Sequence, residues 1–199
     1  DYGGGMYLFG SYLSLTNVTI INNLADYGGG MYLLASYPIL NNVIISENTA
    51  GLFGGGMRIA ESEFTMQYVT FNNNGCGIAG SAIDLNDSDL IITNSTIYGH
   101  SSQQTLMYLS GGNQTSVIIT NSIIWGNLSY EIGPESPIIT YSNIEGGTPG
   151  IGNIDADPLF TDPENGDYTL QAGSSCIDAG TADTDGDGYD DITDYNGQA

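Results

Sequence analysis

Basic side chains are nearly absent from this chain of 199 residues. Arg58 is the only arginine, there is no lysine, and 23 acidic residues bring the formal net charge to −22. Nucleic acid is excluded as a partner, because binding to phosphates requires lysine and arginine. An anionic membrane surface is disfavoured for the same reason. The charge instead suits a chain that stays soluble by repulsion and binds divalent cations.

Cysteine and long apolar runs are also scarce. Cys76 and Cys176 lie far apart in sequence, whereas a disulfide requires Cα atoms within about 7 Å of each other. The cysteine count therefore leaves the redox compartment open. No apolar run reaches the roughly 18 residues of a transmembrane helix, so we expect no membrane insertion in this segment. No signal peptide is recognisable.

Glycine and tyrosine are plentiful, with 29 and 14 copies, and they favour tight turns and strands. A glycine-rich motif recurs at Gly3–Tyr7, Gly28–Tyr32 and Gly54–Arg58, in steps of 25 and 26 residues. A fixed period of this size indicates a repeat architecture. Asp1 falls inside a repeat, so we expect the chain to be a fragment or a processed product.

A second motif follows each glycine-rich one. Its fourth and sixth positions are small or apolar, and this alternation indicates a strand with one buried face. No helical pattern separates the strands, so each must stack on its own copies in parallel sheets, about 4.8 Å per coil. The copies are spaced by 25 to 27 residues, and by 20 at the last step: Leu15–Asn23, Leu40–Asn48, Met66–Asn74, Ile92–His100, Ile119–Asn127 and Ile139–Gly147.

Asparagine dominates the ninth position of this second motif. Stacked asparagine amides hydrogen-bond along a column as a ladder, which we expect here for Asn23, Asn48, Asn74 and Asn127. His100, the only histidine, takes one slot of the column, and we expect the ladder to be interrupted there. The favoured role of His100 is that of a turn residue, and a catalytic or ligand-binding role is the alternative.

These residues carry a resemblance to a known family. A Gly-Gly-Gly-Met strand followed by an Ile/Phe-x-x-Asn strand, as in Phe71–Asn74, resembles the repeats of right-handed parallel β-helix surface proteins of the polymorphic outer-membrane and pectate-lyase-like types. Asn121–Asn127, Asp155–Phe160 and Ser174–Gly180 are similar to the last part of bacterial secreted β-helix proteins with a choice-of-anchor C-terminal region.

The resemblance implies an all-β fold, a right-handed parallel β-helix (solenoid) of about six coils over residues 1–149. Residues 150–199 would form a C-terminal cap, which covers the unpaired strand edges of the last coil. The resemblance also implies an extracellular protein at a bacterial cell surface, whose chain continues beyond Ala199.

Residues 183–194 fit the pattern D-x-D-x-D-G-x-x-D-x-x-D. Oxygens at positions 1, 3, 5, 7, 9 and 12 of such a loop surround a calcium ion, and glycine at position 6 makes the sharp turn. Position 12 is Asp instead of Glu and no helical pattern flanks the loop, so it resembles a thrombospondin type 3 or dockerin loop. The alternative is an acidic linker. The expected ligands are Asp183, Asp185, Asp187, the Tyr189 carbonyl, Asp191 and Asp194.

A second acidic group comprises Asp84, Asp87 and Asp89. Glycosidases use paired carboxylates as acid and base, and the resemblance to β-helix lyases implies calcium with a basic residue. Asp84 aligns one coil away from Arg58, so we expect the two to form an ion pair at the surface. No cleft of polar residues from several coils is evident, and we assign no catalytic residue.

Tyr7, Tyr32 and Tyr108 fall in the same column as Arg58. Stabilisation of the sheet by cross-strand stacking is the favoured role, and binding of sugar rings or of another protein is the alternative.

The sequence therefore favours an extracellular structural or adhesive β-helix that is stabilised by calcium and is not an enzyme. The expected partners are further copies of the chain, joined end to end or laterally into fibres, and glycans. The alternative is a β-helix that binds or degrades polysaccharides, as a lyase or a glycosidase.

Overall fold

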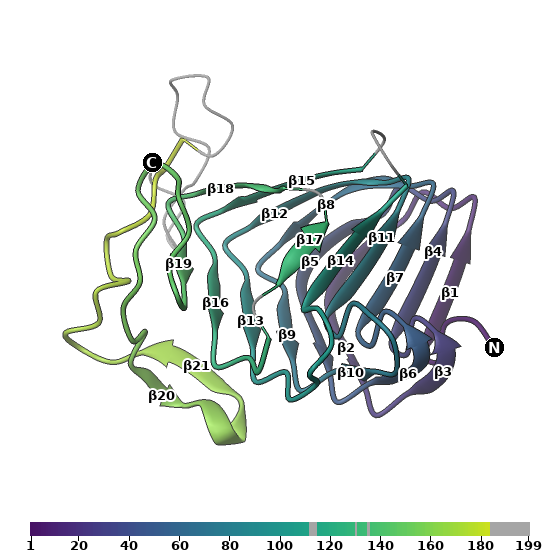
Figure 1. Ribbon diagram of the computed structural model, residues 1–199, viewed down its shortest axis with the longest axis horizontal. Coiled ribbons are helices and arrows are strands. Elements are labelled where there is room, and N and C mark those ends of the chain that lie inside the picture. The colour runs from purple at the N-terminus through teal and green to yellow at the C-terminus, as the bar shows by residue number, and fades with distance from the viewer. Residues whose placement is uncertain (112–114, 130, 135, 184–199) are drawn as a thin grey trace.

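The computed structural model describes residues 1–111, 115–129, 131–134 and 136–183. Stacked parallel strands form a β-solenoid of about five turns (Figure 1). The prediction of an all-β parallel β-helix is therefore confirmed. In this described part of the chain the helix η2 (Pro163–Asn165) has three residues, and no helix is long and apolar enough to cross a membrane.

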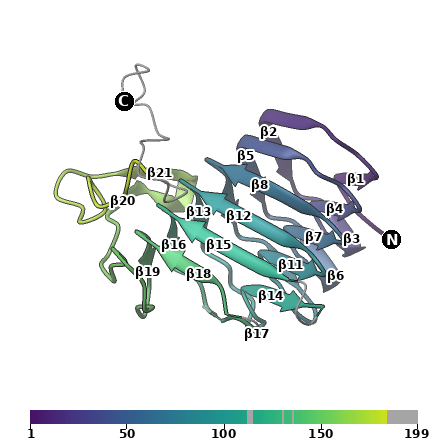
Figure 2. The ribbon, with the colours of Figure 1, turned by 90° about the horizontal axis from the view of Figure 1, so that it is seen from above.

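One sheet, here called the methionine sheet, is built from the strands that follow the glycine motifs. Its strands pair in parallel with matched registers, so that Met6, Met31 and Met57 are neighbours. Figure 2 shows the successive strands side by side along the solenoid. They are β1 (Met6–Phe9), β4 (Met31–Leu34), β7 (Met57–Ala60), β11 (Ile83–Asn86), β14 (Met107–Ser110) and β17 (Ile132–Pro134).

The second motif forms the long sheet, which bends once in every coil. The first two coils cross the bend as single strands, β2 (Ser14–Ile21) and β5 (Ile39–Ser46). Later coils divide there into two strands. These pairs are β8 (Glu63–Gln67) with β9 (Thr70–Asn72), β12 (Asp89–Thr93) with β13 (Thr96–Tyr98), β15 (Ser116–Thr120) with β16 (Ile123–Trp125), and β18 (Ile138–Thr140) with β19 (Asn143–Ile144).

The bend of the long sheet lies at the third position of the second motif. Every residue there has a positive φ, between 48° and 57°, which asparagine tolerates better than most residues. The column comprises Asn17, Asn42, Tyr68, Asn94, Asn121 and Tyr141. The residues at the sixth position of the motif also pair from coil to coil, which confirms the predicted spacing. They are Ile20, Ile45, Phe71, Ile97, Ile124 and Ile144.

A third, short sheet was not predicted. It consists of β3 (Leu24–Tyr27), β6 (Thr49–Phe53) and β10 (Gly75–Cys76) in the first three coils. The chain turns from this sheet into the methionine sheet at the glycine motif, where Gly54 has a φ of 71°. This turn makes a corner between the two sheets, and aromatic side chains line it on the outside.

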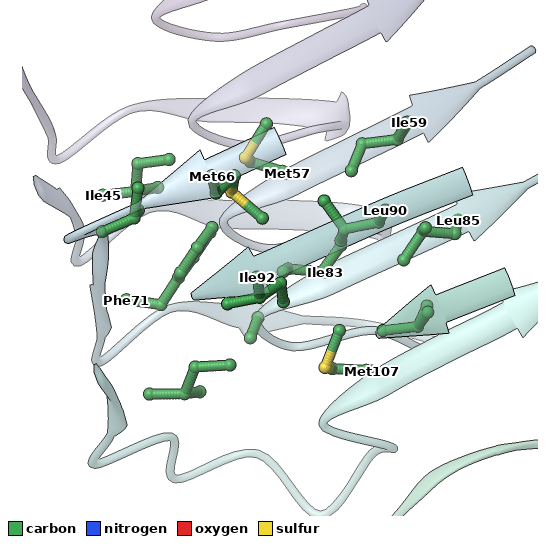
Figure 3. Close-up of a cluster of buried hydrophobic side chains, with 14 of the residues drawn as sticks. Ile45, Met57, Ile59, Met66, Phe71, Ile83, Leu85, Leu90, Ile92 and Met107 are labelled. Atoms are coloured by element: carbon green, nitrogen blue, oxygen red, sulfur yellow. The ribbon is translucent and has the colours of Figure 1, made fainter. Parts of the chain in front are cut away.

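The core lies between the methionine sheet and the long sheet. Figure 3 shows Met57 and Ile83 of the methionine sheet directed into the same space as Met66 and Phe71 of the long sheet. All four side chains are fully buried. Since burial of an apolar side chain contributes about 1.5–3 kcal/mol, this inner column supplies much of the stability of each coil.

The C-terminal segment extends the stack and then turns back along it. Ile154 pairs with Asn143 of β19, so the chain adds a further layer to the last coil. The antiparallel hairpin of β20 (Phe160–Asp162) and β21 (Asp167–Leu170) follows. Phe160 and Tyr168 contact the Tyr98 ring of β13, with centroids 5.6 and 5.3 Å away, and so anchor the hairpin on the long sheet.

Candidate functional site

The chain's single arginine lies in an outward-facing column of the methionine sheet. Met57 and Ile59 face the core, so Arg58 between them faces outward. The register places Tyr32 beside Arg58 on one side and Asp84 on the other. Five consecutive coils thus contribute to one column, which reads Tyr7, Tyr32, Arg58, Asp84 and Tyr108.

Arg58 and Asp84 form the predicted ion pair, with 2.6 Å between Nη1 and Oδ2. The pair is not at the surface, however. The Asp84 side chain is 1% exposed and that of Arg58 is 18% exposed. The expectation of a surface pair is therefore wrong.

Aromatic rings explain why the pair is buried. The Arg58 guanidinium carbon lies 5.1 Å from the ring centroids of both Tyr27 and Phe53, within the range of a cation–π interaction. The Phe53 ring also lies 6.3 Å from that of Tyr108. Asp84 is on β11, which runs between β7 with Arg58 and β14 with Tyr108. The Phe53 ring reaches both of these neighbours and therefore covers Asp84.

Burial sets the ionisation of the site. Asp84 Oδ1 is buried and makes no hydrogen bond. Burial raises the pKa of Asp84 to about 7, although Arg58 acts to lower it. Burial also raises the pKa of the nearby Cys76 thiol to about 11, and the Asp84 charge adds to this shift. The thiol therefore stays protonated and unreactive at neutral pH, whereas the Asp84 carboxyl changes its charge there.

Further tyrosines extend the site toward the first coil. Tyr2 stacks on Tyr27, with 5.2 Å between centroids, and Tyr7 stacks on Tyr32 at 5.5 Å. Tyr2 also contacts Tyr32 at 5.1 Å, which joins the two stacks. We call the whole group the aromatic corner: Tyr2, Tyr7, Tyr27, Tyr32, Phe53, Arg58, Asp84 and Tyr108.

Tyr2, Tyr27 and Phe53 were not predicted to lie at this site. A signal for them was present, since each of the three immediately precedes a glycine motif. Their contact with Arg58 depends on the glycine turn, which folds the strand before it against the strand after it.

The structure does not bring the three aspartates of residues 84–89 together. Asp87 lies in the turn after β11 with a φ of 47°. Asp89 begins β12 in the other sheet, where its Oδ1 accepts hydrogen bonds from the backbone and the hydroxyl of Ser116. Among the described residues, no group of three His, Cys, Asp or Glu side chains is arranged to hold a metal ion.

The predicted calcium loop lies almost entirely beyond the described part of the chain. Asp183 is its one described member. The remaining predicted ligands fall outside the described residues: Asp185, Asp187, Tyr189, Asp191 and Asp194.

The asparagine column forms side-chain hydrogen bonds from coil to coil. Asn23 Nδ2 donates to Asn48 Oδ1, and Asn48 Nδ2 donates to Asn74 Oδ1, both at 3.0 Å. Each acceptor oxygen also receives the backbone N–H of the neighbouring asparagine. Asn48 and Asn74 are buried, so these bonds satisfy polar groups that water cannot reach.

His100 continues this ladder. Asn74 Nδ2 lies 3.3 Å from His100 Nε2, and His100 Nδ1 lies 3.0 Å from Asn127 Oδ1. An amide donates on one side and an amide oxygen accepts on the other, so the pattern assigns the neutral ring with its proton on Nδ1. The expected interruption at His100 is therefore wrong. Burial lowers the pKa of His100 to about 4, because the charged ring would lose its hydration.

His100→Asn is expected to remove part of the acid sensitivity of the fold. The folded pKa of about 4 lies below the ordinary value of 6.5, so the unfolded chain takes up the proton first and stability falls as the pH drops from about 6.5 to about 4. This amounts to about 3 kcal/mol. Urea unfolding should place the variant within about 1 kcal/mol of the original chain at pH 7.5 and above it at pH 4.5. If the free energy of unfolding changed equally with pH in the two proteins, His100 would not be the group responsible for this acid sensitivity.

Two serine columns also form hydrogen bonds from coil to coil and were not predicted. In one of them, Ser88 Oγ accepts the backbone N–H of Ser62, and Ser62 Oγ donates to the Ala60 carbonyl. The sequence carried the signal as serines that recur one coil apart. The columns comprise Ser36, Ser62 and Ser88, and Ser95, Ser122 and Ser142.

No protein-family model matches the chain, and comparison with curated proteins and with solved structures finds no match. The β-helix repeat family and the choice-of-anchor region therefore stay sequence-based predictions. Both cysteines are free in the structure.

Proposed function

We propose that this protein is an extracellular structural element with an adhesive role, in which a rigid β-solenoid presents a binding surface. The observation that carries the proposal is the continuity of the side-chain hydrogen bonds. The ladder joins Asn23 to Asn127 through every intervening coil. A column of satisfied buried polar groups rigidifies the core in which it lies, and a rigid core holds the binding surface in a fixed shape.

The charge of the chain supports an extracellular setting. A net charge of −22 keeps molecules apart by repulsion, and the resemblance of the repeats points to a bacterial cell surface. Calcium bound at residues 183–194 is part of the proposal on the sequence pattern alone, because carboxylates at that spacing suit the ion.

Polysaccharide degradation is the second candidate function, and Asp84 is the observation that favours it. A carboxyl group whose pKa is raised to about 7 could donate a proton near neutral pH, although the Asp84 side chain is 1% exposed and out of reach of a substrate in this structure. Glycoside hydrolysis also needs a second carboxylate about 5–10 Å away. Asp87 and Asp89, the nearest in sequence, lie on a turn and on the other sheet.

A bead-retention assay tests the proposed function. Beads coated with the chain are passed under shear over surfaces that carry neutral polysaccharide, acidic polysaccharide or protein, in calcium chloride and in chelator. We expect retention on at least one surface, lost when the coating is heat-unfolded. Retention on none of them would contradict the adhesive role. Release of reducing ends or of unsaturated sugars from the polysaccharides would favour the enzymatic alternative.

A further inference from the structure

We propose that the aromatic corner is a binding site for a neutral glycan chain built of hexose units. The inference rests on the proposed adhesive function and names its ligand class. It is argued from three features of the corner: its exposed rings, its single guanidinium group and its charge.

The exposed rings provide the contact surface. Tyr2 and Tyr7 are 59% and 48% exposed, and they lie over Tyr27 and Tyr32, on which they stack. Each tyrosine presents an apolar ring with a hydroxyl group at its edge. Such a surface matches a sugar, which has apolar C–H faces and a rim of hydroxyl groups. Because the rings are held by their neighbours, little side-chain entropy is lost on binding.

Arg58 supplies fixed hydrogen-bond donors. A guanidinium carries five N–H groups, and the ion pair with Asp84 uses Nη1. The guanidinium carbon lies 5.1 Å from the centroids of both Tyr27 and Phe53, which stack on each other, and these contacts with the ion pair to Asp84 fix its orientation before any ligand arrives. The side chain also hydrogen-bonds to Tyr32 and is 18% exposed, so only its remaining N–H groups can donate to ligand hydroxyls.

Charge selects a neutral ligand over an acidic one. Above about pH 7 the Asp84 carboxylate neutralises Arg58 within the site, and the chain as a whole carries a formal charge of −22. An acidic polysaccharide would be repelled by this field and would find no free basic side chain, since the sequence has no lysine and no second arginine. Glycans without carboxyl or sulfate groups avoid this repulsion.

The arrangement of the rings favours a chain over a single sugar. Tyr2, Tyr27 and Phe53 come from three successive coils and stack in a row, with centroids 5.2 and 6.2 Å apart and planes within 16° of each other. Because the rings stack on each other, the row presents ring edges at one step per coil along the solenoid axis. An elongated ligand can use several of these contacts at once, which raises its affinity.

Calorimetric titration tests the inference with three neutral probes and one acidic probe. The probes are cellohexaose, laminarihexaose, mannohexaose and hexagalacturonate. We expect at least one neutral hexaose to bind more tightly than hexagalacturonate. Tyr7→Ala should weaken that binding about tenfold, because truncating a central aromatic contact has effects of this size. Tyr37→Ala is the matched control, since Tyr37 is also exposed and stacked, on Tyr12, outside the corner.

Tyr2→Ala provides a second variant that does not depend on the fold, because this side chain is mostly exposed. It should also weaken binding, and the loss of its ring contacts with Tyr27 and Tyr32 should lower the melting temperature only slightly. Absence of binding to all three neutral hexaoses would overturn the inference, as would tighter binding of hexagalacturonate or equal effects of Tyr7→Ala and Tyr37→Ala. If beads are still retained in those cases, the adhesive role stands and only the ligand assignment fails.

Discussion

Arg58→Met is expected to destabilise the chain by about 3 kcal/mol at pH 8.5 and by only about 1 kcal/mol at pH 5. The smaller loss is that of the cation–π contacts with Tyr27 and Phe53. The remainder comes from Asp84, which keeps a buried carboxylate without a partner once the guanidinium is removed. Urea unfolding at the two pH values measures both terms.

The direction of this pH effect follows from Asp84. Its folded pKa of about 7 lies above the ordinary value of 3.8. Stability from the protonated carboxyl is therefore complete below about pH 4 and is lost as the pH rises through 7. Without Arg58, which lowers this pKa, the pKa rises further and the loss continues above pH 7.

Asp84→Asn is the matched control. The amide keeps the shape of the side chain but cannot ionise, so the stability of this variant should not fall as the pH rises through 7. In the double variant, Arg58→Met should cost about 1 kcal/mol at both pH values, the cation–π loss alone. Equal destabilisation by the single Arg58→Met change at pH 5 and pH 8.5 would show that Asp84 is not the group responsible.

Gly55→Ala is the second large effect, and it tests the spacing between coils. A Cβ at Gly55 would lie 2.5 Å from the Gly75 carbonyl oxygen and would also overlap the oxygen of Ser81. Both are backbone atoms of the next coil and cannot turn aside. The coils must separate, which breaks the hydrogen bond from Gly55 N to Gly80 O. We expect a loss of about 3 kcal/mol in the free energy of unfolding.

Gly75→Ala is the control for this prediction, because a Cβ at Gly75 meets no atom within 4 Å. Alanine there should change stability by less than about 1 kcal/mol and could raise it, since it restricts the unfolded chain. Denaturant unfolding of both variants gives the comparison. Equal stability of the two alanine variants would refute the steric explanation.

The register of the solenoid was predictable because every coil repeats one pattern. Alternation in Leu40–Asn48 and its copies indicated which side chains face the core, and the 26-residue step placed Arg58 beside Asp84. Such columns depend only on repeat length, which can be read along the chain. The short sheet of β3, β6 and β10 was not predictable in this way, since its strands have no alternating pattern of their own.

The burial of Asp84 could not be predicted from its column. It depends on Phe53, which reaches across two coils to Tyr108, and a side-chain direction of this kind has no signature in repeat spacing. His100 was misjudged for a related reason. Its ring is larger than an asparagine amide, yet its two nitrogens match the donor of Asn74 and the acceptor of Asn127, a fit that depends on ring orientation.

The sequence by itself determined the solenoid, the order of its strands and the column in which Arg58 and Asp84 meet, because these follow from periodicity along the chain. Only the tertiary structure decided that the pair is buried under aromatic rings, that Tyr2, Tyr27 and Phe53 line the same corner, and that the ladder continues through His100. The physical reason is that burial, pKa and ring contacts arise where separate coils and separate sheets meet in space.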